Sequence, residues 1–216
     1  MKLYNANLSN FASRCRLAIY EKNANVEIAP IPGGDLKSPE YLKLYPLGKT
    51  PAFEMENGEV IGESEVIDEY LEEKFPTPSL FPKGAEARAK VRYVSRFHDL
   101  YLEPPIRALF PQVGAKEKDQ TLITAKLEEI DERFDQLEKL VAGKNGFVAD
   151  EFTFADCTLI PTMFFATLLL PMLGGKNPVE TRSKLGAWWQ TMQTRPNVKK
   201  VLSEQQEALA ERMKGT

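Results

Sequence analysis

A proline-rich segment that separates two unlike parts of the chain most constrains the fold. Residues 75–82 read FPTPSLFP, with three prolines in eight residues. Proline lacks a backbone N–H, so this segment can neither continue a helix nor pair as a central strand. We therefore predict a linker over 77–84, with one domain over 1–76 and a second over 85–216. A length of 216 residues also suits two compact units.

The first domain alternates strand patterns with helical ones. Strands are predicted over 2–5, 26–29, 52–55 and 59–61, and helices over 11–22, 39–44 and 64–74. The pair Asn57-Gly58 between the last two strands is a strong local signal for a hairpin. The order β-α-β-α-β-β-α predicts an α/β thioredoxin-like N-terminal domain, a fold that by itself decides no function.

Beyond the linker, apolar residues recur at helical spacing in every segment. The segments are 85–110, 118–141, 154–170, 179–194 and 198–213. We therefore predict an all-α C-terminal domain. A helical domain beside an α/β domain creates a cleft, which is a frequent place for a small-molecule site.

Composition argues against several classes of function. With 28 basic and 31 acidic residues, the formal net charge is −3, which leaves no basic surplus for binding nucleic acid. The first residues lack the apolar core of a signal peptide, and two prolines and two threonines interrupt the longest apolar stretch, 159–173. We therefore expect a cytoplasmic protein that does not enter a membrane.

Cysteine and histidine are scarce. Cys15 and Cys157 are too few for a disulfide framework, and we expect both to be reduced and buried. A single histidine, His98, excludes any site that needs two, and we predict no metal. A Ser-His-Asp triad is possible only through His98, and nothing in the sequence places Asp and Ser beside it. A hydrolase is therefore set aside.

Ser9 lies between the first predicted strand and the first predicted helix. Its type and position fit a helix N-cap. A second interpretation is that its hydroxyl donates a hydrogen bond to a bound thiolate, because a helix N-terminus favours an anion. Such a donor lowers a thiol pKa of about 8.5 toward neutrality. Both interpretations use the same geometry.

The pair Thr50-Pro51 stands directly before a predicted strand. Its proline is either an ordinary edge-strand proline in the trans form or a cis proline. A cis bond would turn the Thr50 amide and carbonyl outward, where they could pair with an extended, peptide-like ligand.

Polar residues at the last helix of the first domain, and in nearby loops, suit a ligand with two carboxylates. Glu63 and Ser64 either cap that helix or hold an amino-acid head group, with Ser64 on its carboxylate and Glu63 on its ammonium. Lys37 and Lys49 are either solvated or paired with a second carboxylate.

Three segments, taken in order, resemble the glutathione transferase superfamily. They are residues 9–19 (SNFASRCRLAI), 46–52 (PLGKTPA) and 63–67 (ESEVI). Residues 153–156 (TFAD) also look like the family's capping box, and residues 195–198 (RPNV) like its late helix junction. The resemblance thus covers essentially the whole chain.

The resemblance implies a serine-type enzyme, similar to the tau, phi, theta and zeta classes, in which Ser9 activates the glutathione thiol and Pro51 is cis. The residues implied to bind glutathione are Phe11, Lys37, Lys49, Thr50, Pro51, Glu63 and Ser64. Asn10 departs from the proline or serine often found after the catalytic serine, and the zeta-class Ser-Ser-Cys signature is absent, which argues against maleylacetoacetate isomerase activity. Ser13 is the rival hydroxyl, and Cys15 is interpreted as a core residue.

The implied reaction is attack of the glutathione thiolate on a small hydrophobic electrophile, in a cytoplasmic homodimer. The residues expected at the electrophile site are Phe97, Tyr101, Leu109, Phe110, Thr162 and Phe165, although the same spacing is usual in a core. Two alternatives stay open. One is glutathione-dependent ether cleavage, dehalogenation or peroxide reduction, and the other is a non-catalytic binding or assembly module with the same fold.

Overall fold

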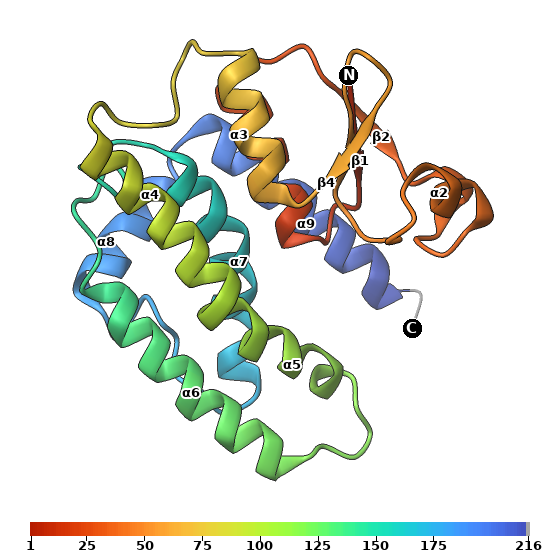
Figure 1. Cartoon of the computed structure of the whole chain (residues 1–216). Coiled ribbons are helices and arrows are strands. Elements are labelled where there is room, and N and C mark those ends of the chain that lie inside the picture. Colours follow the sequence, from red (N-terminus) through yellow and green to blue (C-terminus); the bar gives the residue numbers. More distant parts are fainter. Residues whose placement is uncertain (215–216) are drawn as a thin grey trace. The chain divides into compact units, whose positions relative to one another are not determined.

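The computed structural model describes residues 1–214, which divide into two compact units. Unit 1 comprises residues 1–80 and 196–214, and unit 2 comprises residues 81–195. The elements of unit 1 are β1 (Lys2–Asn5), α1 (Asn10–Glu21), β2 (Glu27–Pro30), a 3-10 turn (Pro32–Gly34), α2 (Pro39–Leu44), β3 (Ala52–Glu54), β4 (Val60–Gly62), α3 (Ser64–Lys74) and α9 (Pro196–Lys214) (Figure 1). The predicted thioredoxin-like α/β fold is confirmed.

The four strands form one mixed sheet in the order β2-β1-β3-β4. β1 runs parallel to β2, with Leu3 opposite Ile28, and antiparallel to β3, with Leu3 opposite Phe53. β3 and β4 are antiparallel, with Phe53 opposite Ile61. The hairpin predicted at Asn57-Gly58 is confirmed, and Gly58 has a φ of 84°, a conformation that glycine adopts without strain.

Neighbouring residues of each strand face opposite sides of the sheet. Phe53 faces α3, where its ring centroid lies 5.6 Å from that of Tyr70. Tyr4 and Ala52 face the other side and form a buried cluster with Tyr41 of α2. The sheet is therefore covered on both faces, and successive apolar residues of a strand pack on opposite faces of the sheet.

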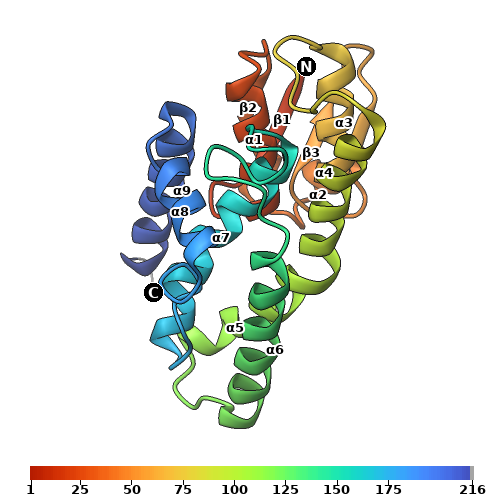
Figure 2. The same cartoon turned by 90° about the vertical axis from the view of Figure 1, so that its left-hand side faces the viewer.

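The C-terminal helix α9 packs against α1 and belongs to unit 1 (Figure 2). Arg16 of α1 is ion-paired with Glu204 of α9, and the Tyr20 hydroxyl donates to the same carboxylate at 3.1 Å. The Lys200 ammonium lies 3.6 Å from the centroid of the Tyr20 ring. The predicted second domain, 85–216, includes α9, whereas in the structure α9 belongs to the same compact unit as the N-terminal residues.

Unit 2 is helical, and the predicted all-α part of the fold is confirmed. Its elements are α4 (Ala85–Phe97), a π-helical segment (His98–Leu102), α5 (Glu103–Val113), α6 (Gln120–Glu138), α7 (Phe154–Met172) and α8 (Ser183–Met192) (Figure 1).

The single helix expected over 85–110 is interrupted by the π-helical segment. Pro104 and Pro105 stand at the start of α5 and supply no backbone N–H to the preceding turn. The Glu103 N–H bonds instead to the carbonyl of His98, five residues earlier. The two prolines therefore account for the change of helix type.

α7 is the core helix of unit 2. It is long and apolar enough to cross a membrane, but 83% of its apolar window is buried within the structure. It begins with the predicted capping box, which is confirmed: the Thr153 hydroxyl accepts from the Ala155 amide, and Asp156 accepts from the Thr153 amide at 2.8 Å.

Candidate functional site

Ser9 is the N-cap residue of α1, as one interpretation of the sequence predicts. Its backbone is extended, with φ −79° and ψ 117°, and its Oγ accepts a hydrogen bond from the Ala12 amide at 3.2 Å. The side chain is only partly buried. Because Oγ acts as the acceptor in this bond, its own proton remains available for donation to a ligand.

Ser13, the rival hydroxyl, is completely buried in α1. Its Oγ donates to the Asn7 carbonyl at 3.4 Å and accepts from the Arg16 guanidinium at 2.6 Å. Cys15 is also completely buried, and its thiol lies 3.5 Å from the Ser64 carbonyl, as expected for a core residue. Neither side chain is accessible to a ligand in this conformation.

The Thr50–Pro51 peptide bond is cis, as the resemblance implies. The Thr50 hydroxyl donates to the Tyr4 carbonyl at 3.3 Å, which ties the start of β3 to the end of β1. In the preceding loop, the Tyr41 hydroxyl donates to the Lys49 carbonyl at 2.6 Å. Hydrogen bonds from α2 and to β1 therefore hold the loop that carries Thr50.

Glu63 and Ser64 form the turn from β4 into α3. Glu63 is exposed and has φ 63° and ψ 109°, an unusual backbone for a residue other than glycine. Within residues 1–214 its side chain makes no capping hydrogen bond, which leaves the carboxylate outside the helix. Beside this turn, the buried Arg14 pairs with Glu65 at 3.2 Å and links α1 to α3.

The register of the sheet brings these three features to one edge. Tyr4, near the end of β1, is opposite Ala52, the first residue of β3, and Ala52 is opposite Gly62, the last residue of β4. Ser9 lies in the segment after β1, Pro51 directly precedes β3, and Glu63 directly follows β4, so all three adjoin this edge. Two helix N-termini, those of α1 and α3, follow these segments and favour negatively charged ligand groups.

The two lysines and the phenylalanine predicted to bind glutathione also lie in unit 1. Lys37 and Lys49 are exposed, and the Lys37 ammonium donates to the Gly48 carbonyl at 3.4 Å. Phe11 is partly buried in the first turn of α1, with the Arg14 guanidinium 5.5 Å from its ring centroid. Lys37 therefore supports the loop that carries Lys49.

The six residues predicted for the electrophile site all lie in unit 2, and most are buried. Tyr101 is 51% exposed and Phe110 is partly exposed, whereas the buried members are Phe97, Leu109, Thr162 and Phe165. Phe97 packs on Tyr101 with ring centroids 5.7 Å apart, and Phe110 packs on Phe165 at 5.3 Å. Two aromatic pairs thus extend from the core to the surface, and the electrophile site stays a prediction.

His98 has neighbours that the sequence did not reveal. Its Nε2 lies 2.7 Å from the Thr162 hydroxyl and its Nδ1 lies 2.8 Å from an Asp99 oxygen. Nothing in the sequence was found to place Asp and Ser beside His98, and the structure places an Asp and a Thr there, Asp99 and Thr162. His98 and Thr162 are each only 1% exposed, so a substrate cannot reach this arrangement, and a hydrolase remains set aside.

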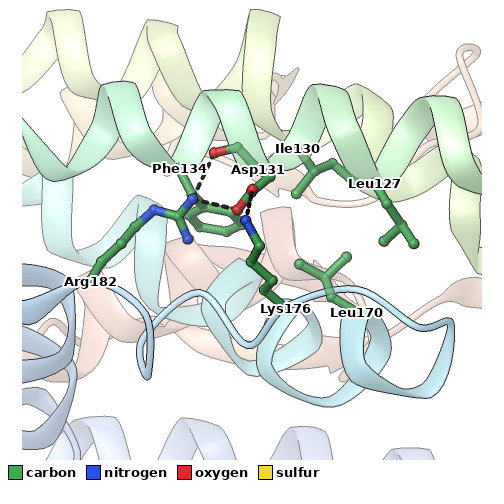
Figure 3. A pocket seen from close by; sticks show the side chains of 7 residues that line it. All are labelled: Leu127, Ile130, Asp131, Phe134, Leu170, Lys176 and Arg182. Atoms are coloured by element: carbon green, nitrogen blue, oxygen red, sulfur yellow. Dashed lines mark hydrogen bonds and ion pairs between the residues drawn. The ribbon is translucent and has the colours of Figure 1, made fainter.

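A small pocket in unit 2 contains a cluster of charges (Figure 3). Lys176 and Arg182 both point at Asp131 of α6, at 2.5 and 2.6 Å. Hydrogen bonds from Lys176 and then Arg182 hold the pKa of Asp131 below its ordinary value. Arg182 also pairs with Asp135, so these charges are mutually satisfied and serve to hold the segment before α8 on α6.

Sequence reasoning missed the residues that support the site. Tyr41 fixes the Lys49 carbonyl, Gly48 has a positive φ of 55°, and Tyr45 lies against Gly62. The sequence signal was the spacing of the two tyrosines, with Tyr41 inside the predicted helix 39–44 and Tyr45 directly after it. Within residues 1–214, no group of three or more His, Cys, Asp or Glu side chains is placed to hold a metal.

Comparison with known proteins identifies relatives over most of the chain. Residues 3–79 match the family model for the N-terminal domain of glutathione S-transferase, and residues 92–196 match the model for its C-terminal domain. The chain is 34% identical over 170 residues to glutathione S-transferase 1 of Dianthus caryophyllus, which covers 74% of this chain and 75% of that protein.

Two further relatives extend this result. Maleylacetoacetate isomerase of Rattus norvegicus is 34% identical over 169 residues, 74% of each chain. The crystal structure of glutathione transferase F2 from Populus trichocarpa matches with a TM-score of 0.81 at 26% identity, covering 95% of this chain and 99% of that one.

Proposed function

Because the chain belongs to the glutathione S-transferase family, we propose that Ser9 holds the thiol of glutathione as a thiolate for attack on a hydrophobic electrophile. The observation that carries this proposal is the Ser9 hydroxyl, which caps α1 as an acceptor and retains a proton for the sulfur. Ser13 is the weaker candidate because its hydroxyl is buried and engaged with Arg16.

The proposed orientation of glutathione follows from the charges around the site. The γ-glutamyl carboxylate binds at the N-terminus of α3 through Ser64, and its ammonium meets Glu63. The cysteinyl backbone pairs with Thr50, next to Pro51. The glycyl carboxylate is left for Lys37 and Lys49, both of which are exposed.

The electrophile is proposed to contact the aromatic pairs of unit 2, through the exposed surfaces of Tyr101 and Phe110. Once the thiolate is formed, the protein supplies proximity and orientation, and the sulfur forms the new bond as the electrophile loses its leaving group. A cytoplasmic location and a homodimeric state belong to the same proposal and rest on the family.

Glutathione-dependent isomerisation is a second candidate, supported by the 34% identity to a maleylacetoacetate isomerase. The absence of a Ser-Ser-Cys sequence after β1 argues against it. Turnover of maleylacetoacetate faster than that of a chloronitrobenzene would favour this candidate over conjugation.

The test compares the wild type with Ser9→Ala and with Ser13→Ala as a control for loss of a neighbouring hydroxyl. Conjugation of 1-chloro-2,4-dinitrobenzene gives kcat/KM, and calorimetry gives the affinity for glutathione. We expect Ser9→Ala to lose at least about tenfold in kcat/KM while it still binds glutathione, and Ser13→Ala to lose much less. Unchanged turnover in Ser9→Ala would remove Ser9 from the role of activator, and no binding by the wild type would favour the non-catalytic module.

A further inference from the structure

Asn7 is an exposed residue whose two oxygen atoms both accept hydrogen bonds. It lies in the turn between β1 and α1, in which the Ser9 amide donates to the Ala6 carbonyl at 2.9 Å. The Asn7 Oδ1 accepts from Arg16 Nη1 at 2.8 Å and from Asn5 Nδ2 at 2.7 Å. The Asn7 carbonyl accepts from Arg16 Nη2 at 3.2 Å. The turn that leads into Ser9 is therefore held at Asn7, and chiefly by one guanidinium.

Arg16 makes these bonds from the interior of unit 1. Its side chain is only 1% exposed and comes from the middle of α1. Nη1 also pairs with the Glu204 carboxylate of α9, and Nη2 also donates to the Ser13 Oγ at 2.6 Å. A planar guanidinium with partners on both terminal nitrogens has a fixed orientation. The position of Asn7 is therefore set by α1 and α9 together.

The position of Asn7 in turn limits that of Ser9, because only Leu8 separates the two residues. On the helical side, the Ser9 carbonyl accepts from the Ser13 amide at 2.9 Å. On the other side, the turn bond to Ala6 and the bonds on Asn7 hold the chain. A hydroxyl must point at its acceptor within narrow limits, so a small shift of the turn weakens the bond that it donates.

We propose that Arg16 is a positioning residue, which holds the turn at Asn7 so that the Ser9 hydroxyl points at the sulfur of glutathione. This inference rests on the role proposed above for Ser9. Arg16 acts through Asn7 and Ser9, so its effect falls on the ionisation of the thiol. The proposed contacts of the rest of the tripeptide, at Thr50 and Glu63, do not depend on it.

The test variant is Asn7→Ala, which removes the Oδ1 acceptor and leaves the buried pair of Arg16 with Glu204 in place. The matched control is Asn57→Ala. Asn57 is also exposed and in a turn, and its Oδ1 also accepts a hydrogen bond, from the Glu59 amide at 3.1 Å. That turn joins the ends of β3 and β4 that lie away from the site. Circular dichroism verifies that each variant is folded.

Two measurements separate thiol activation from ligand binding. Conjugation of 1-chloro-2,4-dinitrobenzene at a series of pH values gives the midpoint of kcat/KM, which reports the ionisation of the glutathione thiol. Calorimetry with S-methylglutathione, which has no thiol proton, gives the affinity of the rest of the site. A merely structural role would weaken the second as well as the first.

We expect the kcat/KM midpoint of Asn7→Ala to rise toward about 8.5, so that kcat/KM falls about 3- to 10-fold near pH 6.5 and little above about pH 9. Its affinity for S-methylglutathione should change less than about twofold. Asn57→Ala should keep the wild-type midpoint and affinity.

Arg16→Lys tests the guanidinium itself, because it keeps a positive charge beside Glu204 and loses the paired donors to Asn7. It should raise the midpoint in the same direction. Combined with Asn7→Ala, it should raise the midpoint no further than the larger single shift, since both changes break one contact. Should Arg16→Lys fail to fold, Asn7→Ala still decides. An unshifted midpoint in Asn7→Ala, or an equal loss of S-methylglutathione affinity, would overturn the proposal.

A Ser9→Ala background separates this proposal from the one on which it rests. There, Asn7→Ala should not move the midpoint again, because the hydroxyl that it misplaces is gone. If Ser9→Ala alone leaves the midpoint unchanged, the role proposed for Ser9 fails. If Ser9→Ala raises the midpoint and Asn7→Ala does not, only the role of Arg16 fails.

Discussion

Lys22 of α1 and Glu72 of α3 form a buried ion pair, with Nζ and Oε2 2.5 Å apart and side chains 0% and 9% exposed. Lys22 also donates to the carbonyls of Phe75 and Pro78, at 2.8 and 2.9 Å. Glu72 accepts from the Ser79 hydroxyl at 2.5 Å. The pair thus anchors the proline-rich segment to unit 1.

Breaking this pair should destabilise the protein strongly. Lys22→Met leaves the Glu72 carboxylate buried without its cation and frees two backbone carbonyls, so we expect a loss of about 3–5 kcal/mol in the free energy of unfolding. A urea titration followed by circular dichroism measures it. The control is Lys74→Met, which removes an exposed pair with Glu56 and should change stability little. Similar midpoints for both variants would contradict the prediction.

The role proposed for Ser9 predicts a change in the pH dependence of conjugation. Hydrogen bonding to the thiolate lowers the thiol pKa, so kcat/KM of the wild type should rise with pH through a midpoint well below about 8.5. In Ser9→Ala the midpoint should move up to about 8.5, so the difference in rate is large near pH 6.5 and small above about pH 9. The measurement is kcat/KM as a function of pH for both proteins. The same midpoint in the wild type and in Ser9→Ala would exclude this role.

Gly48, in the loop before Lys49, should be intolerant of a side chain. It has φ 55°, and a Cβ there would lie 2.7 Å from the Leu36 carbonyl oxygen and 2.8 Å from Leu42 Cδ2. Gly48→Ala should cost about 1–3 kcal/mol of stability and raise KM for glutathione, because the loop that presents Thr50 must move.

Gly58→Ala is the matched control for this prediction. Gly58 also has a positive φ, but among the described residues nothing lies within 4 Å of the added Cβ. It should therefore lose stability through the backbone alone and keep the wild-type KM. Equal KM values for the two variants would show that the Gly48 loop does not shape the glutathione site.

Asp156 makes stability depend on pH. Burial raises its pKa to about 6, although the Trp188 indole and the amides of Thr153 and Phe147 donate to its oxygens. The folded pKa lies above the ordinary value of 3.8, so the protonated form of Asp156 is favoured in the folded protein. Its contribution to the free energy of unfolding is complete below about pH 4 and is lost as the pH rises through about 6.

The measurement compares the wild type with Asp156→Asn, which does not titrate. Relative to this variant, the wild-type free energy of unfolding should fall between about pH 4 and 6.5 by at most about 3 kcal/mol, at about 1.4 kcal/mol per pKa unit. Urea unfolding followed by tryptophan fluorescence reports on unit 2, which contains Trp188. A difference between the two proteins that does not vary with pH would refute the assignment.

Local signals predicted most of the elements. The bounds of β1, α2 and α3 agree with the sequence prediction, because strand patterns, helix start signals and helical periodicity act over a few residues. The hairpin at Gly58 and the capping box at Thr153 are equally local. Residues 85–110 are helical as predicted, but the π-helical segment within them was not predicted; it lies directly before two adjacent prolines.

The sequence by itself determined the two kinds of domain and the order of their elements, since helix and turn signals and apolar periodicity are set by near neighbours. Its motifs at residues 9–19, 46–52 and 63–67 carried the resemblance to the family. The tertiary structure alone decided that α9 packs on α1, that His98 meets Thr162, and that the Tyr45 phenol fills the space above Gly62. Such contacts join residues far apart in the chain. Their geometry depends on how whole faces pack, and no short segment of sequence encodes it.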